Sequence, residues 1–213
     1  MKLPPLKPNF ARFYVVRHGE TEWNAKKILQ GQKDSPLTTK GRKQVKETAK
    51  LLSHIKFEAV FSSDLGRTYQ SAKILTSKKD VEIKTTRLLR ERNFGKFAGK
   101  KVDYFRSQLK KALEYQKKLN QAESLRYQLH PEIETSKQIA ERVIRFIKTT
   151  ALTYPEKNIL VVTHGGVMEV LLVKLGLINK QKNNHGLIAN AAYMVVDSDG
   201  VDLLAQATYG IKI

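Results

Sequence analysis

Short runs of β-branched and apolar residues alternate along the chain with longer segments of helical periodicity. This alternation predicts a succession of βαβ units and therefore an α/β fold around a largely parallel sheet. The predicted strands are residues 12–16, 59–62, 81–85, 158–163 and 192–197, with residues 201–207 as an edge strand.

Helices are expected in the intervening segments. Thr38 and Thr135 each precede an amphipathic segment, and a hydroxyl there can accept a hydrogen bond from the first helical turn. The apolar faces are Val45, Ala49, Leu52 and Ile55 in the first helix and Ile139, Val143, Phe146 and Ile147 in the second. A third helix is expected over residues 166–175, and residues 102–129 predict an amphipathic helical insertion with its lysines facing solvent.

Length and composition favour one soluble domain. The 213 residues, 41% hydrophobic and 28% charged, suffice for one core but are few for two independent ones. No segment approaches the roughly 20 uncharged apolar residues that cross a bilayer, so no membrane association is expected. The absence of Cys excludes disulfides and thiolate catalysis. We expect residues 1–213 to form a single domain in the cytoplasm.

The formal net charge of +19 favours anionic partners, of which nucleic acid is one. The lysines, however, lie along the whole chain, notably in residues 40–50, 78–84, 110–118 and 180–182, with few aromatic residues among them. This distribution is more typical of a basic surface that attracts anionic substrates than of a nucleic-acid-binding face.

Two histidines follow predicted strands directly. His18 comes after the strand at residues 12–16, and His164 comes after the strand at residues 158–163. In open α/β sheets, ligands bind beyond the carboxyl ends of the strands, so one crevice could hold both rings.

Cationic and amide groups are expected at the same crevice. Arg17 adjoins His18, and Arg67 falls in the first helical turn after a third strand. The helix expected near Gly165 would present its N-terminal amides there. Two guanidinium groups, two imidazoles and these amides suit a tetrahedral dianion, and a phosphoryl group fits best.

These residues belong to a longer series of motifs. It reads RHGETEWN at 17–24, QG at 30–31, DSPLTTKG at 34–41, FSSDLGRTYQSA at 61–72, LRERNFG at 89–95 and VVTHGG at 161–166. The series resembles the histidine phosphatase superfamily in its phosphoglycerate-mutase-like branch, in order from about Phe13 to the last strand. The resemblance implies a three-layer fold, with a mixed, mostly parallel sheet flanked by helices and residues 100–134 as a cap over the pocket.

The resemblance also implies roles for individual residues. His18 would be the nucleophile that becomes a phosphohistidine, with Glu91 as proton donor to the leaving group and His164 as a donor to the transferring group. Arg17 and Arg67 would hold the phosphoryl oxygens and should disfavour imidazolium at His18. The other expected substrate contacts are Asn24, Gln30, Gly31 and Gly165. No cofactor and no metal are expected.

Simpler interpretations stay open for several of these residues. Arg67 could pair with Asp64, and Glu91 could be a solvated loop carboxylate. Thr21 could have no role beyond capping a helix, and Ser62 could have no role beyond a hydrogen bond to the backbone. His54, His130 and His185 are expected at the surface.

The function implied is a phosphatase that acts on small phosphorylated metabolites. Mutases of this branch carry a longer insertion with a paired-arginine element, and this sequence has no Arg-Arg pair. A mutase is therefore the alternative, and a module that binds phosphorylated ligands or nucleic acid is a further one. A homodimer is left open.

Overall fold

A computed structural model describes residues 3–179 and 186–213 of the chain. In chain order its elements are β1 (Ala11–Arg17), α1 (Glu22–Ala25), α2 (Thr39–Leu51), β2 (Ala59–Ser63), α3 (Gly66–Leu75), β3 (Ile83–Thr86), η1 (Arg87–Leu89), η2 (Gly95–Phe97), α4 (Val102–Gln108), α5 (Lys110–Lys118), α6 (Gln121–Arg126), α7 (Ser136–Thr153), β4 (Asn158–Thr163), α8 (Gly165–Lys174), β5 (Ile188–Ser198) and β6 (Leu203–Ile211).

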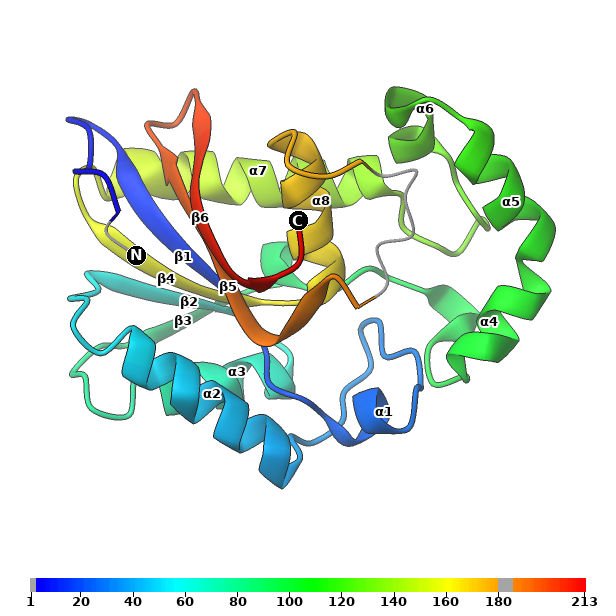
Figure 1. Ribbon diagram of the computed structural model, residues 1–213, viewed down its shortest axis with the longest axis horizontal. Coiled ribbons are helices and arrows are strands. Elements are labelled where there is room, and N and C mark those ends of the chain that lie inside the picture. The colour runs from blue at the N-terminus through cyan, green and yellow to red at the C-terminus, as the bar shows by residue number, and fades with distance from the viewer. Residues whose placement is uncertain (1–2, 180–185) are drawn as a thin grey trace.

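The strands form one sheet in the order β3-β2-β4-β1-β5-β6. The neighbours from β3 to β1 are parallel, whereas β5 and β6 are antiparallel. Helices α2 and α3 cover one face of the sheet, and α7 and α8 cover the other (Figure 1). The predicted three-layer α/β fold with a mixed, mostly parallel sheet is therefore confirmed.

Strand β4 explains how the sheet separates two hydrophobic cores. Successive side chains of a strand point to opposite faces, and both faces of this central strand are covered. Ile159 and Val161 join the core beneath α7 and α8, and Leu160 and Val162 join the core above α2 and α3. The apolar run in the sequence reflects this burial on both sides.

The predicted helix caps are present. The hydroxyl of Thr38 accepts a hydrogen bond from Gly41 N at 2.9 Å, and that of Thr135 accepts one from Gln138 N at 3.2 Å. The helix expected at residues 166–175 runs one residue earlier, from Gly165 to Lys174. None of the helices in the described residues is long and apolar enough to cross a bilayer.

Strand ends differ from the predictions where pairing with a neighbour decides them. Strand β3 begins at Ile83, not at residue 81, because its pairing with β2 starts at Val60. Strand β5 begins four residues before the predicted Ala192, and a register shift between Ile188 and Tyr193 interrupts its pairing with β6. Strand β6 lies at the sheet edge, as predicted.

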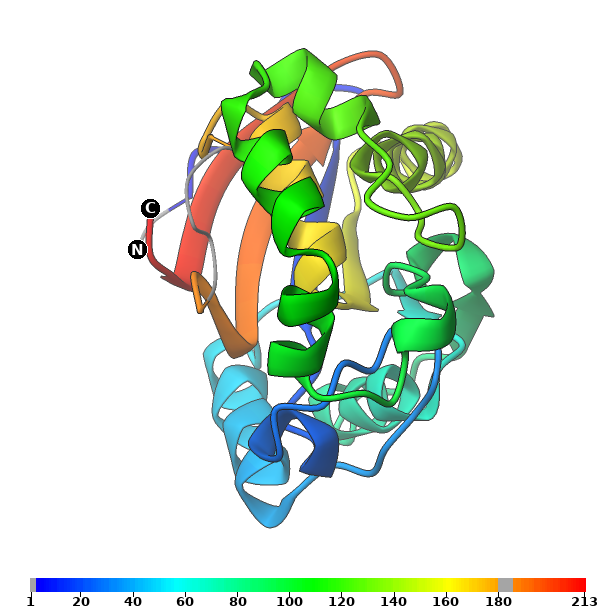
Figure 2. The same cartoon turned by 90° about the vertical axis from the view of Figure 1, so that its right-hand side faces the viewer.

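The segment expected as one amphipathic insertion is helical but divided into the short helices α4, α5 and α6. Asn120 caps α6 and closes a capping box with Glu123, which starts a new helix instead of continuing α5. In Figures 1 and 2 the three helices lie beyond the carboxyl ends of the parallel strands. Their apolar side chains join a separate small cluster, made of Phe97, Phe105, Leu109 and Ile133.

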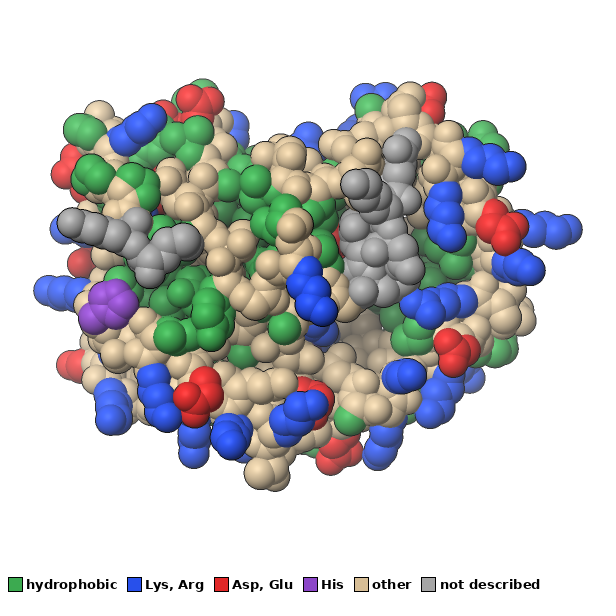
Figure 3. All heavy atoms as spheres, in the orientation of Figure 1, with side chains coloured by type: hydrophobic (Ala, Val, Ile, Leu, Met, Phe, Trp, Pro, Cys, Tyr) green, Lys and Arg blue, Asp and Glu red, His purple; other side chains and the backbone are tan. Residues whose placement is uncertain are grey.

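The basic residues are widely spread over the face seen in Figure 3, where Lys and Arg lie at many separate places around the molecule. This agrees with the distribution expected from the sequence. Helix α7, which carries a local group of basic residues, is an exception.

Candidate active site

Two adjacent parallel strands bring the predicted histidines together. Arg17 is paired with Thr163 in the register of β1 and β4, so the next residue on each strand is a histidine. His18 N continues the pairing by donating to Thr163 O at 3.0 Å. The rings of His18 and His164 lie 5.3 Å apart between centroids, edge to face. The two rings that the sequence predicted to lie together are therefore neighbours, and the crevice around them stays a prediction.

The ring of His18 is oriented by its own backbone. Its Nδ1 lies 2.7 Å from Gly19 O. Because a carbonyl oxygen only accepts, Nδ1 carries the proton in the neutral ring and the lone pair is on Nε2. Burial first, and then the charges of Arg67 and Arg17, lower the pKa of His18 well below its ordinary value. The ring is thus held neutral, with a nucleophilic nitrogen directed away from the backbone.

His164 is fully buried, yet neither of its ring nitrogens has a hydrogen-bond partner among the described residues. Arg17 Nε and Arg67 Nε are buried and unpartnered in the same way. Burial, together with Arg67 and His18, also lowers the pKa of His164 well below its ordinary value. Buried polar groups in native proteins almost always have partners, so a set of unpaired nitrogens marks a place for a ligand with acceptor atoms.

Arg67 is held in place before any ligand arrives. Its Nη1 donates to Lys33 O at 2.7 Å and to Asp34 Oδ1 at 3.0 Å, and its Nη2 donates to Gly31 O at 2.7 Å. A guanidinium has five N–H groups, which leaves Nε and one hydrogen of Nη2 for an anion. The alternative pairing of Arg67 with Asp64 is wrong, because Asp64 binds Arg90 through both oxygens.

The QG pair belongs to this supporting loop. Gly31 has φ of +55°, a conformation that glycine adopts without strain, and its carbonyl is the one that Arg67 binds. Gln30 is buried, and its Oε1 accepts a hydrogen bond from Ser35 Oγ at 3.4 Å. Direct contact of either residue with substrate stays a prediction.

Arg17 reaches the site from the end of β1. Its Nη1 donates to Ile188 O at the start of β5. Gly165 lies directly against it, because a Cβ at that position would be 3.1 Å from Arg17 Nε. A glycine at residue 165 therefore allows the guanidinium to pack on the first turn of α8.

Glu91 lies over the N-terminus of α8 instead of extending into solvent. Its Oε2 accepts from Gly166 N at 3.2 Å, and its Oε1 accepts from Arg92 N at 2.8 Å. The interpretation as a solvated loop carboxylate is therefore wrong. One helix amide that we expected to face phosphate is bound to Glu91 here, since a carboxylate is favoured at the positive end of a helix.

Helix α7 supports the loop that carries Glu91. Arg142 donates to Leu88 O at 2.7 Å and to Glu91 O at 3.4 Å, while pairing with both oxygens of Glu134. Arg92, which follows Glu91 in this loop, also donates to the backbone oxygen of Glu134. Nothing in the local sequence around Arg142 distinguishes it from other basic residues of an amphipathic helix, so sequence reasoning missed it.

Asn190 links the side chain of Asn24 to the backbone of His18. Asn24 closes a capping box with Thr21, which confirms Thr21 as a helix cap. The Asn24 Oδ1 is thereby occupied, and its amide nitrogen is the part left to donate to a ligand. Asn190 donates to His18 O at 3.3 Å and to Asn24 Oδ1 at 3.5 Å. No sequence pattern indicated Asn190.

The remaining minor predictions have mixed outcomes. Ser62 Oγ donates to Ser63 O at 2.7 Å, as the backbone-bonding interpretation expected. His54 is exposed, whereas His130 is half-buried with its ring against Phe97. His185 lies outside the described residues.

A profile of the histidine phosphatase superfamily (branch 1) matches residues 13–206. The chain belongs to this superfamily. A protein of Escherichia fergusonii named as a probable phosphoglycerate mutase, GpmB, is 42% identical to it over 90 residues, and one of Enterobacter sp. with the same name matches equally. The match spans 42% of this chain and 42% of each of those proteins, so it covers less than half of their length.

Solved structures of the superfamily resemble the chain over nearly its whole length. A phosphoglycerate mutase from Bacillus anthracis superposes with a TM-score of 0.81 at 25% identity, covering 96% of this chain and 94% of that one. A mycobacterial glucosyl-3-phosphoglycerate phosphatase superposes with a TM-score of 0.77 at 21% identity, covering 94% and 99%. The similarity to the phosphatase shows the fold alone. A protein named as a phosphatase and one named as a mutase thus share the architecture of this chain.

Proposed function

We propose that this protein is a metal-independent phosphatase of small phosphorylated metabolites, acting through a phosphohistidine on His18. The observation that supports this most is the group of buried, unpartnered nitrogens on His164, Arg17 and Arg67 around a neutral His18. A phosphoryl group supplies acceptor oxygens for these donors and an electrophilic phosphorus for the His18 lone pair.

In the first step, His18 Nε2 attacks phosphorus in line and the bond from phosphorus to the ester oxygen breaks. The departing alkoxide takes the proton of a neutral Glu91 carboxyl group, the form that the dianion of the bound ester favours, and backbone amides fix the position of this group over the α8 N-terminus. Charge spreads over the phosphoryl oxygens in the transition state, where the two arginines and His164 stabilise it.

In the second step, water attacks the phosphohistidine and transfers a proton to the Glu91 carboxylate. The N–P bond breaks, inorganic phosphate leaves, and His18 and Glu91 return to their starting states. No metal cation is needed to neutralise the phosphoryl oxygens, because guanidinium and imidazole groups are already placed to do so.

A comparison of two substrates with different leaving groups tests this division of roles. Metabolite esters expel a poor alkoxide that needs a proton, whereas p-nitrophenyl phosphate expels a phenolate that is stable near neutral pH. Glu91→Gln should therefore lower kcat for alkyl esters by about 100-fold to 10,000-fold, with little effect on kcat for the aryl ester unless dephosphorylation limits turnover. Equal losses with both substrates would contradict the role of Glu91.

Labelling tests the nucleophile independently. Acid quenching during turnover, alkaline work-up and peptide mapping should locate an acid-labile, base-stable phosphate on His18. His18→Ala should abolish turnover of both ester types, and label on another residue, or on none, would refute the mechanism.

Phosphoglycerate mutase activity is the second candidate, favoured by the names of the curated relatives. It uses the same phosphohistidine but returns the phosphoryl group to another hydroxyl. The absence of an Arg-Arg pair argues against a second site that would hold the partly reacted substrate. The partition of phosphoglycerate between free phosphate and its isomer distinguishes the two.

A further inference from the structure

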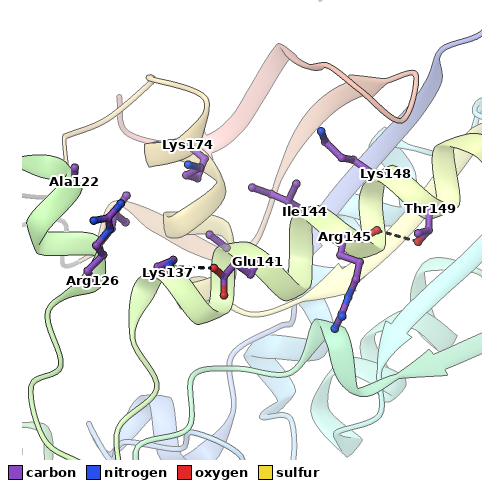
Figure 4. A pocket seen from close by; sticks show the side chains of 11 residues that line it. Ala122, Arg126, Lys137, Glu141, Ile144, Arg145, Lys148, Thr149 and Lys174 are labelled. Atoms are coloured by element: carbon purple, nitrogen blue, oxygen red, sulfur yellow. Dashed lines mark hydrogen bonds and ion pairs between the residues drawn. The ribbon is translucent and has the colours of Figure 1, made fainter.

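A groove of about 590 Å³ runs along the outer face of α7, and none of the residues lining it belongs to the candidate active site (Figure 4). It is bounded by α6 at one end and by the C-terminal part of α8 along one side. The lining residues of α7 extend from Lys137 to Thr149, which is about 18 Å of helix. That length suits a segment of polypeptide better than a compact metabolite.

The floor of the groove is aliphatic. Leu125, Ala140 and Ile144 lie along it, and Ala140 and Ile144 are one turn apart on α7. The small side chain of Ala140 leaves room for the backbone of another chain to approach. The groove therefore offers apolar contacts at the spacing that apolar side chains on a helix can match.

The rim of the groove is strongly basic. Its cations are Arg126, Lys137, Arg145, Lys148 and Lys174. The one carboxylate among the described lining residues is Glu141, which pairs with Lys137 at 3.6 Å. Within the part of the chain that the structure describes, Arg126, Arg145 and Lys174 form no ion pair.

These cations surround the apolar floor instead of meeting at one point. In Figure 4, Lys148 and Lys174 lie on the same side of α7 as Ile144, Arg145 points to the other side, and Arg126 lies at the α6 end. A ligand with a single anionic headgroup could meet one of these positions and would leave the rest unpaired. Several anionic groups spaced along an apolar segment match the whole rim.

We propose that this groove binds an acidic amphipathic helix of a partner protein, with its apolar face on the floor and its carboxylates at the rim. This is helix-in-groove recognition, in which anchors at helical spacing fill the groove and charges fix the register. Single-stranded RNA fits less well, because the described residues that line the groove include no aromatic side chain on which its bases could stack. A flat bilayer would meet the rim without filling the hollow floor.

A synthetic helix can test the proposal on the intact protein. The probe is a fluorescein-labelled peptide of about 16 residues with Leu at helical spacing on one face and Glu on the other. Fluorescence anisotropy at about 0.15 M salt limits attraction by distant charges, since the Debye length there is about 8 Å. A peptide of the same composition, scrambled so that it has no apolar face, should bind at least about tenfold more weakly.

Charge-reversed variants distinguish binding at the groove from attraction to the basic surface as a whole. Lys148→Glu/Lys174→Glu, on the side of α7 where Ile144 lies, should weaken binding of the amphipathic peptide by at least about tenfold. The matched control Lys43→Glu/Lys46→Glu changes net charge equally on α2, which covers the opposite face of the sheet, and should stay within about twofold. Both pairs should keep native turnover of p-nitrophenyl phosphate, which checks folding without entering the binding readout.

A second pair of variants tests the apolar floor of the groove. Ile144→Asp should weaken binding, whereas Leu152→Asp, at an exposed apolar position on the same helix outside the groove, should not. Equal losses in the two charge-reversed pairs, or equal binding of the scrambled peptide, would overturn the proposal. The proposal would also fail if the groove substitutions weakened the binding of oligouridylate or of phosphatidylglycerol vesicles and left the binding of the peptide unchanged.

Discussion

Acidification from pH 7 to pH 5 should destabilise the fold of this protein before most carboxylates titrate. His18 and His164 are buried, and burial and neighbouring positive charges lower the pKa of both rings well below the ordinary value. The unfolded chain therefore binds protons at these two residues that the folded chain does not. Their contribution is fully present above pH 6.5 and is lost as the pH falls toward the folded-state pKa values.

The magnitude follows from proton linkage. An unfolded histidine has a pKa near 6.5, so each of the two adds a slope of about 1.4 kcal/mol per pH unit in the acid range where the folded ring stays neutral. Over the interval from pH 7 to pH 5, the cost has an upper limit of about 2 kcal/mol for each ring and about 4 kcal/mol for the pair, which is reached when both folded rings stay neutral throughout. This is a large share of the 5–15 kcal/mol, roughly, that stabilises a typical domain.

Urea unfolding at a series of pH values, in buffers without phosphate, measures the effect. His164→Asn removes one of the two groups and should halve the slope, and His18→Asn/His164→Asn should remove most of it. Comparing slopes cancels the cost of the substitutions themselves and the titration of other groups. A double variant that loses stability with pH as steeply as the native protein would show that these histidines are not the cause.

Three further outcomes are expected. A strong chelator such as EDTA should leave phosphatase turnover intact, and loss of activity that magnesium or zinc restores would contradict metal independence. Asp197→Ala should lower the free energy of unfolding by about 3–5 kcal/mol, because it leaves the buried Arg12 guanidinium unpaired, whereas Arg12→Met/Asp197→Leu should be near neutral; denaturant titration compares the two. With 3-phosphoglycerate as substrate, free phosphate should appear faster than the 2-phospho isomer, and the reverse order in a time course would favour the mutase.

Much of the fold could be predicted because local pattern and tertiary packing agree in the central strands. The apolar run of β4 is buried on both faces, so its composition alone indicates a strand. The ends of β3 and β5 could not be predicted in the same way. They depend on the pairing of β3 with β2 and on a register shift in the pairing of β5 with β6, which the residue types of β3 and β5 do not indicate.

The candidate site shows the same division. His18, His164 and Arg67 follow strands that turned out to be neighbours, so their position after a strand was a sufficient signal. Asn190, which donates to His18 O, directly precedes Ala191, whose φ is +59°. A non-glycine residue in that conformation is not indicated by its own type, and tertiary contacts must hold it there.

The separate hydrophobic cluster beneath α4 and α5 has a consequence for how the chain can change. Phe97, Phe105, Leu109 and Ile133 pack with one another and not with the two cores that hold β1 and β4 in register. A substitution that loosens this cluster would cost stability locally and would leave the distance between the two histidines unaltered. Substitutions in this cluster should therefore alter the segment that carries α4 and α5 without disturbing the strand register that places the two histidines side by side.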